Sequence, residues 1–442
     1  MPNNGQNQVR PERRAVVIGG ARTPFVKAFS EFLELDTIAL GMKAVNRLLE
    51  RYPVPHSEID SLIWGSVIAP SHAPNVGREI VLDARLPPNV EAMTVSRACT
   101  SGLQAVTLAA ASIERGEADV VIAGGSDSTS NAEVKLPQKV VHAAAPLMFG
   151  KPNVRQVLGV LSQLVPLSEL LPRVPKVAER TTGKTMGESA EEMARRNDIS
   201  REAQDEFAVR SHQRAANAIA SGRFAEEIVP VEAGKKGEKK RLLSTDTLVR
   251  SDTSVEKLAK LSPVFAKNGT LTAGNSSALT DGGAAVLLMS AEKAKALGFR
   301  PLARFAAWSY AGVDPTDQLL IGPALAIPKA LARAGYELQS IDFVDMHEAF
   351  AAQVLSVLKA LGSDAFAQMR LGYSKAVGEI DPERLNVHGG SLALGHPFAA
   401  TGARMVTTMA NELVKTGRQS ALLGICAAGG LAAAAVLENA TP

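Results

Sequence analysis

Two stretches decide the fold, because the second repeats the pattern of the first 300 residues later. The first, "SGLQAVTLAAASIERGEADVVIAGGSDS", runs from residue 101 to 128, and the second, "TGARMVTTMANELVKTGRQSALLGICAAGG", runs from residue 401 to 430. In each, a glycine (Gly102, Gly402) opens an Ala-rich helical stretch, and an apolar strand ending in Gly-rich sequence follows. The pattern predicts one structural unit that occurs twice.

A second pair of matching stretches lies upstream of the first pair. "LLERYPVPHSEIDSLIWGSV" (48–67) aligns with "ALARAGYELQSIDFVDMHEA" (330–349) at an offset of 282, so that an Ile-Asp pair precedes a short apolar strand in both. Two matches in the same order indicate duplicated halves. Because helix, loop and buried strand alternate in each half, we expect an α/β core of two βαβ-type halves with a largely parallel sheet covered on both faces.

The duplication also predicts the domain organisation. Residues 1–14 are polar and are expected to form a flexible tail with no secretory signal. The first half is expected at 15–130 with 262–290, and the second half at 291–442. The intervening region, 131–261, differs in character and is predicted to be an inserted loop domain. It contains a long helical pattern over 189–222.

Composition narrows the class of function. A net charge of +3 over 442 residues gives no reason to expect nucleic-acid binding. Two cysteines make no disulfide framework and fit a reducing compartment such as the cytoplasm. No CxxC or His-rich spacing occurs, so no metal site is predicted. The uncharged run at 421–437 is better explained by two buried strands joined by a Gly-Gly turn than by a membrane span.

Cys99 is the first candidate for chemistry. It is either a small buried hydrophobic residue or, because Gly102 and the Ala-rich run follow it, a thiol at a helix N-terminus, where the helix dipole would lower its pKa. A nucleophilic thiol needs a base, and His347, His388 and His396 are the candidates in the second half. The repeat brings the loops of Cys99, His396 and Cys426 to one end of the core.

The chain resembles the thiolase family over nearly its whole length. The matching motifs, in order, are "ARTPF", "SRACTSG", "AGGSDS", "TAGNSSALTDGGAA", "HEAF", "GGSLALGHPFAATGAR" and "CAAGG". The resemblance implies a layered α-β-α-β-α core with an inserted loop domain that binds CoA. It implies an acetyl-CoA C-acyltransferase that cleaves 3-ketoacyl-CoA with CoA as cosubstrate, through an acyl-cysteine, in fatty acid β-oxidation.

The resemblance also implies the role of each site residue. Cys99 matches the acylated nucleophile, His396 the base that activates it, and Cys426 the second catalytic cysteine, which moves a proton. His347 matches a position where many members of the family have Asn. Four further positions match expected CoA contacts: Met186, Arg250, Ala273 and Ser277. No other cofactor is expected.

His at position 347 resembles the β-subunits of trifunctional fatty-acid oxidation enzymes and their bacterial relatives. We therefore expect a homodimer or higher oligomer, and a hydratase–dehydrogenase subunit as a further partner. Within the insert, residues 134–180 carry an apolar stripe, Val154 to Val165, with few charges beside it. The sequence leaves three roles open for this segment: docking a partner, contacting a membrane surface peripherally, or packing on its own core. It also leaves open the preferred acyl chain length of the substrate and the physiological direction of the reaction.

Three alternatives remain. A biosynthetic acetoacetyl-CoA thiolase lies within the same family. A ketoacyl-ACP synthase would use Cys with two His, or with His and Asn, and would have no need of Cys426. A non-enzymatic lipid-binding or scaffold member would tolerate the loss of Cys99, His396 or Cys426, yet all three are present.

Overall fold

The computed structural model describes residues 9–134, 137–138, 140–142, 145, 178–235 and 237–441. The chain forms two compact units, Met1–Asn131 with Glu179–Pro442, and Ala132–Ala178. Everything below concerns the first unit. The apolar stripe at 154–165 lies outside the described residues, and the predicted boundaries of the halves and the insert stay predictions.

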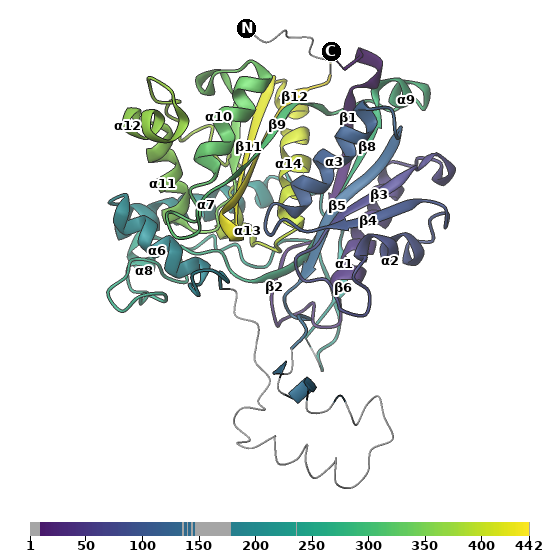
Figure 1. The fold of residues 1–442 in the computed structure, drawn as a ribbon. Coiled ribbons are helices and arrows are strands. Elements are labelled where there is room, and N and C mark those ends of the chain that lie inside the picture. The colour runs from purple at the N-terminus through teal and green to yellow at the C-terminus, as the bar shows by residue number, and fades with distance from the viewer. Residues whose placement is uncertain are drawn as a thin grey trace. The chain divides into compact units, whose positions relative to one another are not determined.

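One ten-stranded sheet runs through the unit in the order β10-β11-β12-β9-β1-β8-β5-β3-β4, with β2 paired to β8 (Figure 1). A separate ribbon pairs β6 with β7. The strands are β1 (Ala15–Arg22), β2 (Val26–Lys27), β3 (Ser61–Gly65), β4 (Glu91–Val95), β5 (Val120–Ser128), β6 (Val231–Ala233), β7 (Arg241–Leu243), β8 (Thr280–Ser290), β9 (Ala303–Gly312), β10 (Phe343–Met346), β11 (Ser420–Ala427) and β12 (Leu431–Asn439).

Helices connect the strands and cover both faces of the sheet. They are α1 (Thr37–Arg51), α2 (Val76–Asp83), α3 (Ser101–Glu114), α6 (Met186–Arg196), α7 (Arg201–Ala220), α8 (Val255–Leu258), α9 (Ala291–Ala296), α10 (Pro323–Ala334), α11 (Ala351–Leu361), α12 (Asp364–Phe366), α13 (Ser391–Leu394) and α14 (Ala400–Thr416). Short 3₁₀ turns precede β3 (His56–Glu58) and β10 (Leu338–Ser340).

The two Ala-rich helices of the repeat, α3 and α14, form the central layer between the two halves of the sheet (Figure 1). Alternate residues of β5 show the layering, because Val121 and Ala123 pack into this layer while Val120 and Ile122 pack against α1 and α2 on the outer face. In the second half, alternate residues of β11 face the central layer and the outer layer of α10 and α11. The expected α-β-α-β-α order is confirmed.

The duplication is visible in equivalent hydrogen bonds. In the first half, the Asp60 carboxylate accepts from the backbone N–H of Val120, the first residue of β5 (2.9 Å). In the second half, the Asp342 carboxylate accepts from the N–H of Ser420, the first residue of β11 (3.1 Å). Each aspartate therefore fixes the start of the strand that leads to the site.

The expectation of a largely parallel sheet is wrong. Only the pairs β3–β4, β3–β5 and β10–β11 are parallel, and the other pairs in the described sheet are antiparallel. The reason is visible at β11 and β12, which are joined by a single turn, Ala428–Gly430. A connection this short can only give antiparallel neighbours. The same turn confirms the predicted hairpin over 421–437.

The helical pattern over 189–222 forms two helices instead of one. α6 ends at Arg196 and α7 begins at Arg201, because Asp198 adopts a positive φ of 50° and the Ser200 side chain caps α7 by accepting from the N–H of Ala203 (3.1 Å). Within the described residues, no helix is long and apolar enough to cross a membrane.

Candidate active site

Cys99 sits in a tight turn between β4 and α3. Ala98, directly before it, has a φ of 46°, a conformation that side chains other than glycine rarely adopt. The Ser101 hydroxyl holds this turn, since it accepts from the Arg97 N–H (2.7 Å) and donates to the Ala98 carbonyl (2.6 Å). The turn presents a half-buried thiol one residue before the N-cap of α3, Thr100.

The expectation of a lowered pKa for this thiol is wrong, because its pKa is raised. Burial raises the pKa of Cys99 to about 12; the backbone N–H of Ala428 opposes the rise, and the Asp127 carboxylate adds to it. Loss of hydration is the largest cause, because a thiolate in apolar surroundings has little solvation. At neutral pH the resting group is a thiol, which needs a base to become a nucleophile.

Two buried imidazoles can act as the base that the thiol needs. His347 follows β10, and its backbone N–H donates to the Gly424 carbonyl in the neighbouring β11 (2.8 Å). His396 lies in the loop before α14. The two rings lie 4.0 Å apart between centroids, with an interplanar angle of 39°. Burial lowers the pKa of His396 to about 3 and that of His347 well below its ordinary value, so both rings are neutral at pH 7.

A hydroxyl fixes the orientation of each ring. The Nδ1 atom of His347 is hydrogen-bonded to Ser391 Oγ (2.8 Å), and that of His396 to Thr401 Oγ1 (2.7 Å). Hydroxyls both donate and accept, so each ring can carry its proton on either nitrogen. Among the described residues, neither Nε2 atom has a hydrogen-bond partner. A ring with Nδ1–H bonded to its hydroxyl therefore has a free lone pair on Nε2.

The structure brings Cys99 and these two histidines together. The Cys99 sulfur and one ring nitrogen from each of His347 and His396 all lie within 4.8 Å of one another. Cys426, in β11, is buried. Its pKa is raised well above the ordinary value, mainly by burial and in second place by the nearby Cys99. The Cys99 thiol and two imidazoles thus surround one point, with Cys426 close enough to Cys99 to be affected by its charge. A neutral imidazole there can accept a thiol proton.

His388, the third histidine considered, has a different partner. Its Nε2 atom is hydrogen-bonded to the Glu412 carboxylate (2.6 Å), which also accepts from the Arg223 guanidinium (2.8 Å). The ring of Phe224 packs edge-on against His388. These contacts join α14 to the chain after α7 and identify His388 as a structural residue.

The positions matched to CoA contacts lie on several elements. Ser277 is beside the site, because its N–H donates to the carbonyl of Ala349, two residues after His347 (3.0 Å). Ala273 is exposed in the same loop, and Met186 is the first residue of α6. Arg250 is exposed, and its backbone N–H donates to His212 Nδ1 (3.2 Å). Contact with CoA stays a prediction for these residues.

Asp127, which the sequence reasoning did not select, ties three loops of the site together. One carboxylate oxygen accepts from the N–H groups of Val67 (2.8 Å) and Ile68 (2.7 Å), and the other accepts from the N–H of Ala399 (2.9 Å). Burial raises the pKa of Asp127 to about 7, against these hydrogen bonds, which lower it. A single acidic residue in an otherwise uncharged strand, as in "AGGSDS", was the available signal.

A buried ion pair that the sequence reasoning did not select influences both histidines. Arg404, in α14, donates to the Asp345 carboxylate in β10 (2.7 Å), and both side chains are almost fully buried. The Arg404 charge contributes to the lowered pKa of both His347 and His396. This pair therefore favours the neutral state of the two rings.

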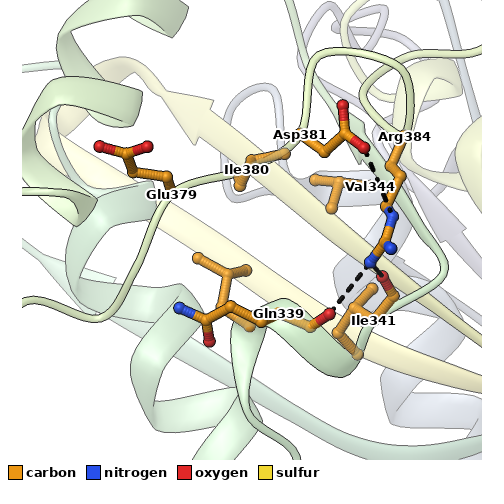
Figure 2. A pocket seen from close by; sticks show the side chains of 8 residues that line it. Gln339, Ile341, Val344, Glu379, Ile380, Asp381 and Arg384 are labelled. Atoms are coloured by element: carbon orange, nitrogen blue, oxygen red, sulfur yellow. Dashed lines mark hydrogen bonds and ion pairs between the residues drawn. The ribbon is translucent and has the colours of Figure 1, made fainter.

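A separate hollow of about 220 Å³ lies at the other end of β10 (Figure 2). There Arg384 donates to the backbone carbonyls of Gln339 (3.0 Å) and Ile341 (3.2 Å) and faces the Asp381 carboxylate. Because His347 follows the carboxyl end of β10, this hollow is not part of the candidate active site.

Comparison with known proteins identifies the same family in both parts of the chain. Residues 15–292 match the family described as "Thiolase, N-terminal domain", and residues 299–439 match "Thiolase, C-terminal domain". The chain is 45% identical over 428 residues, 97% of each chain, to a protein of Pseudoalteromonas translucida named 3-ketoacyl-CoA thiolase.

Solved structures agree. A Bacillus anthracis acetyl-CoA acetyltransferase superimposes with a TM-score of 0.81 at 34% identity, covering 96% of this chain and 98% of that one. Human mitochondrial 3-ketoacyl-CoA thiolase superimposes with a TM-score of 0.80 at 31% identity, covering 98% and 100%. A structure of the same human enzyme in complex with CoA gives a TM-score of 0.79, also at 31% identity, covering 97% and 98%.

Proposed function

Because this chain belongs to the thiolase family, we propose that it is a 3-ketoacyl-CoA thiolase, which uses CoA to cleave 3-ketoacyl-CoA into acetyl-CoA and a shortened acyl-CoA. The observation that carries the proposal is the meeting of Cys99 with two neutral imidazoles within 4.8 Å. A thiol beside a neutral base is the arrangement that covalent catalysis by cysteine needs.

In the first half-reaction, His396 takes the proton of Cys99 as the sulfur attacks the ketone carbon of the substrate. The tetrahedral oxyanion needs donors, each typically worth about 3 kcal/mol. His347 serves as one when its Nε2 carries the proton and its Nδ1 accepts from Ser391. The bond between the α and β carbons then breaks, which leaves an acyl group on Cys99, and Cys426 gives its proton to the departing acetyl-CoA carbanion.

In the second half-reaction, Cys426 takes the thiol proton of an incoming CoA. The CoA sulfur attacks the acyl-Cys99 thioester, and the Cys99 sulfur leaves and recovers its proton from His396. The raised pKa of both cysteines suits this cycle, because each resting thiol holds the proton that it later transfers.

The setting of the reaction is part of the proposal. We place the enzyme in cytoplasmic β-oxidation of fatty acids, as a homodimer or higher oligomer that works with a hydratase–dehydrogenase subunit. Support comes from His347, the residue by which the sequence resembles the trifunctional-enzyme β-subunits. The role of residues 134–180 in docking that subunit, or a membrane surface, belongs to the same proposal.

A second candidate function is biosynthetic condensation of two acetyl-CoA molecules. The structural similarity to the Bacillus anthracis acetyl-CoA acetyltransferase favours it. The same residues serve thiolysis and condensation, so the two functions differ in the acyl chain length of the substrate and in the net direction of the reaction.

Thiolysis rates against a series of 3-ketoacyl-CoA substrates, from acetoacetyl-CoA to long chains, test the proposal. We expect acetyl-CoA and an acyl-CoA shortened by two carbons, with higher kcat/KM for medium or long chains, and no product from Cys99→Ala. Activity restricted to acetoacetyl-CoA would favour the biosynthetic function. Acyl transfer to an acyl carrier protein in preference to CoA would refute both.

A further inference from the structure

Cys99, His347 and His396 together form a donor set that suits a soft divalent cation. Cysteine sulfur and imidazole nitrogen are the protein ligands that Zn²⁺ prefers, and three such ligands with an open fourth position are typical of exchangeable zinc sites. We propose that these three side chains bind Zn²⁺ and that the bound ion blocks acylation of Cys99. The blocking of acylation rests on the proposed function of Cys99, whereas the binding itself rests on geometry alone.

The spacing of the ligand atoms is close to what a zinc ion requires. The sulfur and the two ring nitrogens lie within 4.8 Å of one another. Zn–S and Zn–N distances of about 2.3 and 2.0 Å place neighbouring ligands of a tetrahedral ion roughly 3.3–3.5 Å apart. The site must therefore contract by at most roughly 1.5 Å for each pair of ligand atoms. The two ring centroids, now 4.0 Å apart, must also move apart so that both rings point at one ion. Rotation of the Cys99 side chain and tilting of the two rings can supply these movements.

The surroundings orient both imidazoles for such binding. With its Nδ1–H donating to Ser391 or Thr401, each ring directs a lone pair on Nε2 away from its hydroxyl. Metal-bound histidines commonly make this second hydrogen bond, which fixes the ring and its tautomer. Both Nε2 atoms are buried and have no partner among the described residues, so coordination breaks no existing hydrogen bond.

The charge and proton balance also permit binding. Arg404, the buried cation whose charge affects both rings, is paired with the Asp345 carboxylate at 2.7 Å, which offsets its repulsion of a second positive charge. As the Zn–S bond forms, the thiol proton of Cys99 passes to bulk water, and hydrated Zn²⁺ loses all but one of its waters as the three protein ligands bind. A water on the fourth position completes the coordination. No change of oxidation state is involved.

His347 makes this site particular to chains of this type. Many members of the thiolase family have Asn at this position, and an amide is a poor ligand for zinc compared with imidazole. His347→Asn should therefore remove one ligand while keeping an amide that can still donate a hydrogen bond to substrate.

Binding is tested on the purified full-length protein without CoA, because the CoA thiol itself binds zinc. Equilibrium dialysis should show Zn²⁺ bound by the wild type, and Co²⁺ should give a sulfur-to-cobalt charge-transfer band. Ser391→Ala should weaken Zn²⁺ binding by about 10- to 100-fold, and His347→Asn should weaken it more. The cobalt band should vanish in Cys99→Ser and persist in Cys426→Ser. Mg²⁺ should not compete.

Alkylation of Cys99 gives a second readout that distinguishes this site from others on the protein. Zn²⁺ should protect Cys99 from iodoacetamide in the wild type, as followed by peptide mass mapping, and should protect it at least tenfold less in His347→Asn. Equal protection in both proteins, or a cobalt–sulfur band that survives in Cys99→Ser, would overturn the proposal. If Zn²⁺ protects Cys99 but the protein cleaves no 3-ketoacyl-CoA, the metal site holds and the proposed function fails.

Discussion

Gly102 and Gly402, which the repeat places 300 residues apart, each lie against the backbone of the other's helix where α3 and α14 cross. A Cβ atom on Gly102 would lie 2.0 Å from the carbonyl oxygen of Ala399, and one on Gly402 would lie 2.4 Å from the backbone nitrogen of Leu103. Both distances are shorter than any stable contact. The two copies of one sequence position therefore make the central crossing of the fold, and the same crossing carries the loops of Cys99 and His396.

The first prediction concerns this crossing. Gly102→Ala and Gly402→Ala should each lower the free energy of unfolding by about 1–3 kcal/mol or more, because the helices must separate to admit a methyl group. Chemical denaturation measures the effect. Gly312→Ala is the matched control, since a Cβ there meets no atom within 4 Å and its φ is not positive. A loss as large at Gly312 as at the crossing would contradict the explanation.

The second prediction separates the two cysteines. Cys426→Ser should still allow Cys99 to be acylated by acyl-CoA, but should slow turnover by about 10²- to 10⁴-fold, the usual contribution of an acid–base group. Cys99→Ala should take up no acyl group at all. Mass mapping after incubation with acyl-CoA checks both, and an acyl label found only on Cys426 would reverse the assignment.

The third prediction separates the two histidines. His396→Asn should lose activity by about 10²- to 10⁴-fold, because an amide cannot accept the Cys99 proton. His347→Asn should keep substantial activity, because an amide can replace an imidazole N–H as a donor. Steady-state thiolysis of one substrate by both variants measures the difference, and equal losses would refute the division of roles.

The fourth prediction concerns pH and stability. In the unfolded chain His396 takes up a proton near its ordinary pKa of 6.5, whereas in the folded protein it does so only near 3. Since the unfolded state binds more protons in this window, the contribution of His396 to stability is lost as pH falls from about 6.5 towards 3. Denaturation at several pH values should show a shallower pH dependence in His396→Asn than in wild type.

Asp127 acts in the opposite direction and must be included in that comparison. Its pKa is raised to about 7 in the fold, so the folded state binds more protons than the unfolded state between about 4 and 7. The stability that it contributes is lost as pH rises through that range. The difference between wild type and His396→Asn removes this common term. An unchanged pH dependence in the variant would show that the His396 ring is not held neutral by the fold.

The sequence was sufficient to predict the architecture. Two offsets, 300 and 282, predicted duplicated halves, and the equivalent hydrogen bonds of Asp60 and Asp342 are the physical form of that repeat. The predicted parallel direction of most strands was wrong, because helix–strand alternation does not fix strand direction, whereas the short turn after β11 does. A turn of three residues admits only an antiparallel neighbour.

The candidate site was predictable only in part. Cys99, His347, His396 and Cys426 belong to rare residue types in distinctive Gly-rich settings, so sequence reasoning could select them. The hydroxyls of Ser391 and Thr401 belong to common residue types, and only the folded chain shows that they hold the two rings. The pKa of Cys99 depends on burial, which the position of a helix start does not reveal.

The crossing of α3 and α14 also has a consequence for the order of folding. Cys99 comes from the first half of the chain, whereas His347, His396 and Cys426 all come from the second. During synthesis, a chain that has completed only its first half holds the Cys99 thiol with neither imidazole beside it. Attack on a thioester with the help of His396 therefore requires the second half of the chain to be folded against the first.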